Sequence, residues 1–229
     1  MQTDETSAVT ASTFSELGVS SDLVSVLEKS GIEAPFPIQR LCVPDALAGR
    51  DVCGKAKTGS GKTLAFGLPL VERIGDASPG HPSGLVLVPT RELALQVAEV
   101  IEPLAQARGK KLATVYGGAR INRQIKDVEN GAEIVVATPG RLIDLIDRGV
   151  AKLTQISSVV IDEADRMADM GFLPQVEWLM RHVEGEHQTL LFSATLDGGI
   201  SSLVERYQND PVFHDVASTS VTVEKMVHR

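Results

Sequence analysis

The chain has 229 residues, of which 43% are hydrophobic and 23% are charged, so it can bury a substantial core in one domain, and disordered and collagen-like classes are excluded. Its 30 acidic residues outnumber its 22 Lys and Arg residues and give a net charge of −8, which excludes a global cationic field that would hold nucleic acid non-specifically. Any contact with nucleic acid must therefore be local.

The cysteine content and the hydropathy pattern indicate the compartment. Cys42 and Cys53 are too few for a disulfide framework or a zinc site. The apolar runs span only a few residues, far short of the roughly 18 needed to cross a bilayer. The sequence also shows no signal peptide. We therefore expect a soluble, cytoplasmic protein with no membrane partner.

The N-terminal region changes character near residue 14. Residues 1–13 are rich in Ser, Thr and acidic side chains and contain almost nothing to bury, which predicts a flexible tail. The following segment SSDLVSVLEKSG places Leu23, Val26 and Leu27 at helical spacing after a Ser/Asp start, and Gly31 ends the pattern. We expect one short amphipathic helix here.

From residue 51 onward, short β-rich runs alternate with longer segments of helical period, such as the one that begins at Arg91. Several runs are almost continuously apolar, as in strands buried on both faces of a parallel sheet, and the helical segments supply the crossovers that parallel strands need. The pattern predicts one doubly wound α/β domain over residues 14–216, with a mostly parallel sheet and helices on both faces. The expected strands are 51–56, 85–90, 112–118, 133–140, 159–164 and 189–195, with 211–216 as a possible seventh.

A phosphate-binding loop follows the first of these strands, where ligands of open α/β sheets bind. The segment AKTGSGKT matches the loop pattern except for an alanine in place of its first glycine. Its glycines let backbone N–H groups point at a phosphate, and the next helix adds its positive N-terminal end. An ordinary Gly/Ser turn is the alternative, disfavoured by the strand, loop and helix order. The expected nucleotide-binding residues are Ala56, Lys57, Thr58, Gly59, Ser60, Gly61, Lys62 and Thr63, with Lys62 on the β- and γ-phosphates and Thr63 on Mg²⁺.

A second chemical signal is VVIDEAD, residues 159–165, where an apolar strand ends in carboxylates. Asp162 is positioned to hold Mg²⁺, and Glu163 is positioned to orient or deprotonate the attacking water. Alone, such a cluster is more often a solvated helix start. Together with the loop at Lys62, it indicates a nucleoside-triphosphatase with Lys62, Asp162 and Glu163 as the catalytic set.

Six motifs in one order then resemble the DEAD-box ATP-dependent RNA helicases: AKTGSGKT, PTREL at 89–93, Gly117-Gly118, TPGR at 138–141, DEAD at 162–165 and SAT at 193–195. The resemblance is to the first, RecA-like domain and covers about residues 14–216. It implies that the sheet edge binds single-stranded or duplex RNA through the sugar-phosphate backbone. Without the resemblance, Arg91 and Arg141 would be interpreted as salt-bridged residues at helix starts. The implied RNA-binding residues are Pro89, Thr90, Arg91, Gly117, Gly118, Thr138, Pro139, Gly140 and Arg141.

The resemblance also implies a coupling motif, in which Ser193 and Thr195 hydrogen-bond toward Asp165. The alternative for SAT is a strand-end turn. The resemblance implies that such contacts connect the nucleotide state with the RNA side of the domain.

An adenine site is implied by GIEAPFPIQ, which resembles the family's Q motif. Gln39 can both donate to and accept from the adenine edge, and Phe14 fits the isolated upstream aromatic. Ile32 stands where the family has an aromatic residue, and Phe36 stands where it has Thr, so we expect weak stacking on adenine unless Phe36 supplies a ring. Core packing is the alternative for Phe14 and Phe36.

A complete helicase of this family has a second RecA-like domain with an arginine-rich motif, and no HRxGRxGR-like string occurs in this chain. We expect residues 217–229 to begin an interdomain linker. The chain should then be a monomer that binds ATP and Mg²⁺, hydrolyses ATP poorly and does not unwind RNA, because arginine fingers contribute about 10³ to 10⁵ in rate. Alternatives are another P-loop ATPase or a kinase, disfavoured by the remaining motifs, and an ATP-gated RNA clamp or assembly scaffold.

Overall fold

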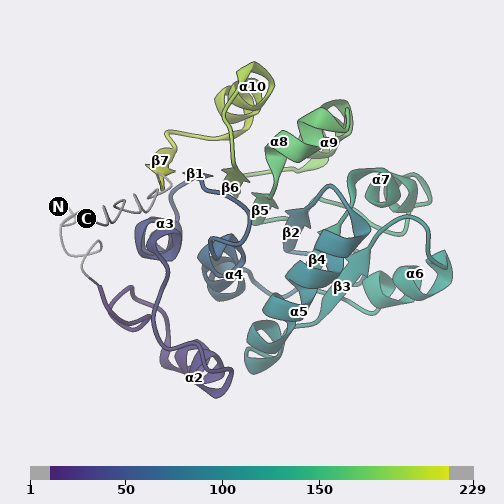
Figure 1. The fold of residues 1–229 in the computed structure, drawn as a ribbon. Helices are drawn as coiled ribbons and strands as arrows, with labels where there is room; N and C mark the ends of the chain where they lie inside the picture. The colour runs from purple at the N-terminus through teal and green to yellow at the C-terminus, as the bar shows by residue number, and fades with distance from the viewer. Residues whose placement is uncertain (1–10, 217–229) are drawn as a thin grey trace, which may run out of the picture.

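A seven-stranded sheet runs through the computed structural model, which describes residues 11–216. Every neighbouring pair of strands is parallel, and the strand order is β3-β4-β2-β5-β6-β1-β7. Helices cover both faces (Figure 1), so the predicted doubly wound α/β fold is confirmed. The strands are β1 (Val52–Lys55), β2 (Gly84–Leu87), β3 (Leu112–Val115), β4 (Ile134–Ala137), β5 (Ser158–Ile161), β6 (Gln188–Ser193) and β7 (Val212–Asp215).

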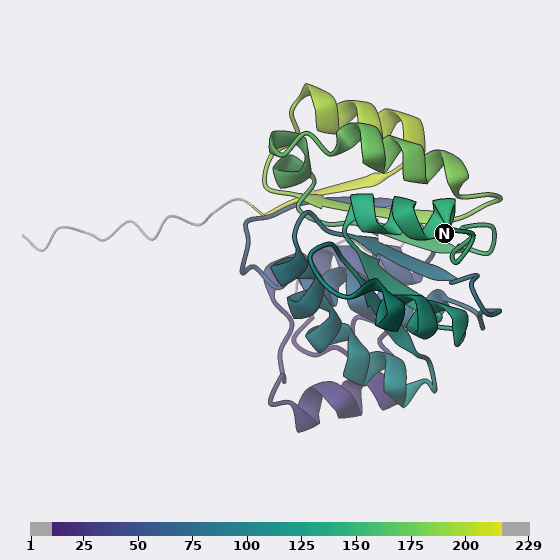
Figure 2. The same ribbon diagram turned by 90° about the vertical axis from the view of Figure 1, so that its right-hand side faces the viewer.

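The helices form two layers, each with its own apolar core. One core lies beneath α3, α4 and α5, with α2 packed outside them, and the other lies beneath the helices from α6 to α10; the two views show these layers on opposite faces (Figures 1 and 2). The helices are α2 (Ser21–Lys29), α3 (Pro37–Leu47), α4 (Lys62–Arg73), α5 (Arg91–Ala107), α6 (Ile121–Glu129), α7 (Pro139–Asp147), α8 (Ala164–Asp169), α9 (Leu173–His182) and α10 (Gly198–Tyr207).

All seven predicted strands are present, and each is shorter than predicted. The predicted strand 85–90 ends at Leu87, because Thr90 is the N-cap of α5 and its Oγ1 accepts a hydrogen bond from Leu93 N at 3.3 Å. The predicted strand 133–140 likewise ends at Ala137, since Pro139 begins α7. Pro and Thr at these positions favour a helix start over a strand, so the motif residues lie in the strand-to-helix loops and the first helical turns at the carboxyl edge.

The N-terminal boundary lies earlier than predicted. Ala11 is buried in the core, and Glu16 Oε2 accepts hydrogen bonds from the backbone N–H groups of Ser12 and Thr13. Placing a tail over residues 1–13 was therefore wrong for residues 11–13, where one apolar side chain and a local carboxylate order the chain. Residues 1–10 and the predicted linker 217–229 lie outside the described residues.

The predicted helix after the N-terminal segment is confirmed as α2. It ends where Gly31 adopts a φ of 73°, and Gly31 N and Ile32 N donate to Glu28 O and Leu27 O at 3.0 and 2.9 Å. This pairing is the Schellman ending, which favours glycine at the left-handed position. Among residues 11–216, no helix combines the length and the apolar character that a membrane span requires.

The strand order divides the predicted motifs into two groups. Strands β5, β6 and β1 are neighbours and lead into DEAD, SAT and the phosphate loop. Strands β3, β4 and β2 are also neighbours and lead into the glycine pair, TPGR and PTREL. All strands point the same way, so both groups lie along one edge of the sheet, with the nucleotide motifs beside the RNA motifs.

Candidate nucleotide site and RNA track

The phosphate loop connects β1 to α4 and depends on its glycines. Gly59 and Gly61 have φ values of 83° and 88°, in the left-handed region that other residues rarely adopt. A Cβ atom on Gly61 would also lie 2.5 Å from both Gln39 Nε2 and Phe36 Cδ2. Gly61 is the N-cap of the twelve-residue helix α4, whose first N–H groups and dipole form an anion-binding end.

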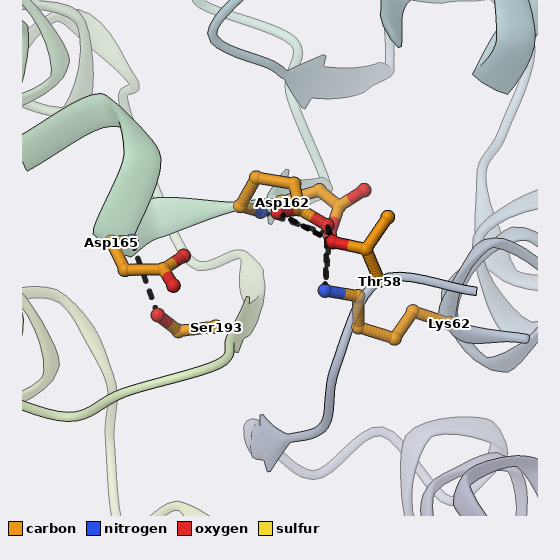
Figure 3. A network of polar contacts seen from close by, with 6 residues as sticks. Thr58, Lys62, Asp162, Asp165 and Ser193 are labelled. Carbon is orange, nitrogen blue, oxygen red and sulfur yellow. Dashed lines mark hydrogen bonds and ion pairs between the residues drawn. The ribbon is translucent and has the colours of Figure 1, made fainter. Parts of the chain in front are cut away.

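The phosphate loop contacts the DEAD segment directly. Lys62 Nζ donates to Glu163 Oε1 at 2.7 Å and lies 3.9 Å from Asp162 Oδ1. Thr58 Oγ1 donates to the same Glu163 carboxylate oxygen at 3.0 Å. Lys62, Asp162 and Glu163 are all buried, and Figure 3 shows Thr58 and Lys62 pointing toward the Asp162 segment. The sequence-predicted catalytic residues therefore meet in one cluster.

Glu163 and Asp162 are both held in unusual environments. Glu163 has a φ of 55°, one of two positive φ values among the non-glycine residues of the described chain, and such backbone strain concentrates at functional sites. Burial is the largest influence on the Asp162 carboxyl and raises its pKa; Lys62 lowers this pKa and Glu163 raises it, and together these effects bring the pKa to about 7. The Asp162 carboxyl is therefore poised to change its proton or cation near neutral pH.

The donor set suits Mg²⁺ rather than a fully protein-coordinated metal. Within the part of the chain that the structure describes, no group of three or more His, Cys, Asp or Glu residues could hold a metal ion. Mg²⁺ is usually bound by one or two protein oxygens together with phosphates and waters. The Asp162 carboxylate and the Thr63 hydroxyl supply oxygens of this kind.

The predicted adenine-site residues have different surroundings. Phe14 is 2% exposed and packs in the core, so assigning it to nucleotide contact was wrong: its apolar ring is more stable when buried. Ile32 is half-buried against the same core, whereas Phe36 is 55% exposed. Gln39 is 2% exposed, accepts from Phe36 N at 2.8 Å and donates to Gly61 O at 2.9 Å. Its amide thus ties the Q-motif segment to the phosphate loop.

The SAT motif joins two parts of the nucleotide site. Ser193 Oγ accepts from Asp165 N at 3.1 Å (Figure 3), and Ser193 O accepts from Ala56 N at 3.0 Å. The bond from Ser193 goes to the Asp165 backbone, while Asp165 Oδ1 is buried with no partner within residues 11–216. The predicted contact from Thr195 to Asp165 was wrong, because Thr195 is exposed beyond the end of β6.

Most of the predicted RNA-binding residues surround one surface depression of about 470 Å³. Thr90 and Gly118 are absent from its lining; Thr90 instead caps α5. Sequence reasoning missed three further residues: Asp144, which lies one turn after Arg141 on α7, and Phe172 and Gln175, which the packing of α9 against α7 brings to this edge. The lining consists of Pro89, Arg91, Gly117, Thr138, Pro139, Gly140 and Arg141, together with Asp144, Phe172 and Gln175.

The two arginines of this depression differ in environment. Arg91 is exposed, and its guanidinium carbon lies 5.2 Å from the centre of the Tyr116 ring, a cation–π distance. Arg141 is half-buried, and its Nη1 donates to Ala119 O at 3.3 Å and to Gln124 Oε1 at 3.2 Å. Arg141 Nε also lies 3.9 Å from Asp144 Oδ2, so the alternative of a salt-bridged arginine at a helix start applies to Arg141 as well. Both guanidinium groups lie at this depression in a chain whose net charge is negative.

The fold and the loop-to-acid geometry define a RecA-like P-loop nucleotide-binding domain. Comparison with known proteins identifies the family, because the profile of the DEAD/DEAH box helicases matches residues 36–203. The chain belongs to this family and corresponds to its N-terminal RecA-like domain.

Individual relatives agree with the family assignment. The chain is 42% identical over 214 residues to the DEAD-box ATP-dependent RNA helicase CshA of Bacillus subtilis, covering 93% of this chain and 43% of that protein. It is 46% identical over 200 residues to the ATP-dependent RNA helicase DeaD of Haemophilus influenzae, covering 87% of this chain and 32% of that protein. The chain thus spans less than half the length of either relative.

Solved structures give the same result for the fold. A DEAD box protein from the hyperthermophile Methanococcus jannaschii superimposes with a TM-score of 0.84 at 38% identity, over 90% of this chain and 56% of that one. The yeast DEAD-box splicing factor Prp28 superimposes with a TM-score of 0.79 at 32% identity, over 85% of this chain and 48% of that one.

Proposed function

We propose that this chain is the ATP-binding domain of a DEAD-box RNA helicase that couples ATP binding and hydrolysis to RNA unwinding or remodelling. The observation that carries the proposal is the contact of Lys62 with Glu163, next to Asp162, on the same sheet edge as the depression that contains Arg91 and Arg141. The names of the relatives support ATP as the nucleotide and RNA as the other ligand.

The contacts in the site suggest how binding prepares hydrolysis. An incoming phosphate would replace the Glu163 carboxylate as the partner of Lys62, with the N-terminal end of α4 stabilising the same negative charge. Glu163 would then be free to accept a proton from the attacking water. Asp162 and Thr63 would hold Mg²⁺, which supplies positive charge against the phosphates. Mutual neutralisation in the Lys62–Glu163 pair stabilises the site until that exchange.

Ser193 provides a route from this site to the rest of the domain. It contacts the first residue of the phosphate loop, Ala56, and the last residue of DEAD, Asp165. A displacement of either segment on nucleotide binding would therefore move the other. We propose that Ser193 and Asp165 couple the nucleotide state to RNA in this way.

The proposal also extends to partners. A second RecA-like domain in the full-length protein would supply arginines at the γ-phosphate and the other half of the RNA track. The 229-residue chain alone should be a cytoplasmic monomer that binds nucleotide, binds single-stranded RNA weakly, and shows almost no RNA-stimulated ATPase activity. Robust duplex unwinding by this chain alone would contradict the proposal.

The central test separates binding from chemistry in the full-length protein. Glu163→Gln should retain ATP and RNA binding but stall turnover, because an amide cannot accept the water proton. The matched control is Glu186→Gln, an exposed glutamate remote from the motifs, which should leave turnover unchanged. Normal ATP hydrolysis by Glu163→Gln would refute the assigned role. ATP-dependent RNA holding by the wild type without strand separation would favour the clamp instead.

A further inference from the structure

A buried glutamine behind the RNA track has both polar atoms of its side-chain amide hydrogen-bonded to the track's own segments. Gln124 lies on α6 and is 5% exposed. Its Oε1 accepts from Tyr116 N at 3.1 Å and from Arg141 Nη1 at 3.2 Å, and its Nε2 donates to Tyr116 O at 3.1 Å. Val128 of α6 is also buried, and Ile121 and Ile125 pack against the same core, so Gln124 is the polar member of the face that anchors this helix.

These bonds bring three separate segments into one arrangement. Tyr116 directly precedes the glycine pair. Its backbone N–H and C=O both bond the Gln124 amide, as they would bond a neighbouring strand if β3 continued for one more residue. The Tyr116 ring in turn lies beneath the guanidinium of Arg91 in PTREL. Arg141 belongs to TPGR. One side chain therefore fixes the glycine loop directly, Arg141 directly and Arg91 through the tyrosine ring.

We infer that Gln124 is a positioning residue of the RNA track, which sets the placement of Arg141 and of the Gly117 loop for an RNA backbone. The inference rests on the proposed function. A primary amide is suited to this task, since it can accept from an N–H and a guanidinium and donate to a carbonyl at the same time. Buried hydrogen bonds of this kind hold geometry because leaving any partner unpaired is costly.

The test compares two substitutions in the 229-residue chain. Gln124→Met keeps the unbranched shape but removes every hydrogen bond, whereas Gln124→Glu keeps the acceptor for Arg141 and Tyr116 N and loses the donor to Tyr116 O. The control is Gln106→Met, which makes the same chemical change at an exposed site near the C-terminal end of α5, away from Arg91. RNA affinity is measured by fluorescence anisotropy with a labelled oligouridine ten-mer at low salt, and ADP affinity by calorimetry.

We expect Gln124→Met to weaken RNA binding about tenfold, Gln124→Glu to weaken it about two- to fivefold, and Gln106→Met to leave it unchanged. ADP affinity should stay constant in all three, because β3 and β1 lie in opposite halves of the sheet. A purely structural role would lower the melting temperature without separating the two affinities.

Three results would overturn the inference while leaving the proposed RNA function intact. The first is an RNA affinity of Gln124→Met equal to that of the wild type. The second is a loss of ADP affinity in Gln124→Met as large as its loss of RNA affinity. The third applies if Gln124→Met does not fold, and it is an unchanged RNA affinity in Gln124→Glu. Absence of RNA binding by the wild-type chain would instead refute the proposed RNA function and this inference with it, so the two failures are distinguishable.

Discussion

Replacing Asp162 by Asn should stabilise the domain at alkaline pH and lose most of that advantage in acid. Asp162 is 4% exposed, and burial, followed by the neighbouring Glu163, raises its pKa to about 7 although Lys62 opposes the change. Asn retains the shape and still accepts the hydrogen bond that Glu163 N donates to Asp162 Oδ1 at 2.9 Å. The substitution therefore removes a buried charge and little else.

The direction in which stability changes with pH follows from proton binding. The pKa of Asp162 rises from 3.8 in the unfolded chain to about 7 in the folded one, so between these values the folded state holds a proton that the unfolded state has released. Stability must then fall as pH increases through this window. At 1.36 kcal/mol per pH unit, the full difference is on the order of 4 kcal/mol, and the part between pH 5 and pH 8 is about 3 kcal/mol.

Urea unfolding at pH 5 and pH 8 in the presence of EDTA measures this effect, since a divalent cation would otherwise compensate the charge. The stability of Asp162→Asn minus that of the wild type should be about 3 kcal/mol larger at pH 8 than at pH 5. Asp169→Asn, an exposed change on α8, should differ from the wild type by less than about 0.5 kcal/mol at both pH values. An advantage of Asp162→Asn that is equal at pH 5 and pH 8 would refute the reasoning.

Three further predictions concern nucleotide binding and the thiols. Lys62→Ala should weaken ADP binding about 10- to 100-fold in calorimetric titration, because one charge-assisted contact to phosphate is lost; equal affinity would reject the phosphate loop. Phe36→Thr should weaken ADP binding by at most about tenfold, because the exposed ring of Phe36 lies over Gly61. Ile32→Tyr should leave ADP affinity unchanged, because Ile32 packs on the core. Tighter ADP binding by Ile32→Tyr would show instead that the adenine site is under-stacked. The thiols of Cys42 and Cys53 should resist Ellman's reagent at pH 8 until guanidinium unfolds the chain. Burial raises the pKa of Cys53 to about 11 and that of Cys42 further still, so neither forms the reactive thiolate. Fast labelling of the native protein would contradict this burial.

The sequence was sufficient to predict the strands and the motifs that follow them. Strands such as β2, β4 and β5 are buried along their whole length, which produces the continuous apolar runs visible in the sequence. The motifs contain Gly, Pro and Thr at fixed spacing, so their loop positions are encoded locally. Thr195 was wrongly placed because a motif identifies a turn but not which of its side chains face inward.

Contacts between distant segments could not be predicted in the same way. The Lys62–Glu163 pair joins residues 101 positions apart, and the burial of Phe14 depends on helices that follow it in the chain. An isolated aromatic is equally compatible with a ligand site and with a core. Gln124 gave no signal at all, because one glutamine in a polar helix reads as a solvent-exposed residue until the guanidinium of Arg141 is placed beside it.

The backbone itself connects the nucleotide half of the edge to the RNA half. Asp162 N donates to Leu87 O at 3.0 Å, Val88 N donates to Ala137 O at 3.0 Å, and Thr138 N donates to Val115 O at 2.9 Å. Each bond crosses to the next strand at the point where a motif begins, so the acidic site and the RNA depression share one continuous set of hydrogen bonds. Such a ladder resists deformation, so the movement that the proposed coupling requires should arise in the loops beyond it. The side chains that tie those loops together, Ser193 on the nucleotide side and Gln124 on the RNA side, are consequently where substitutions should change coupling without unfolding the sheet.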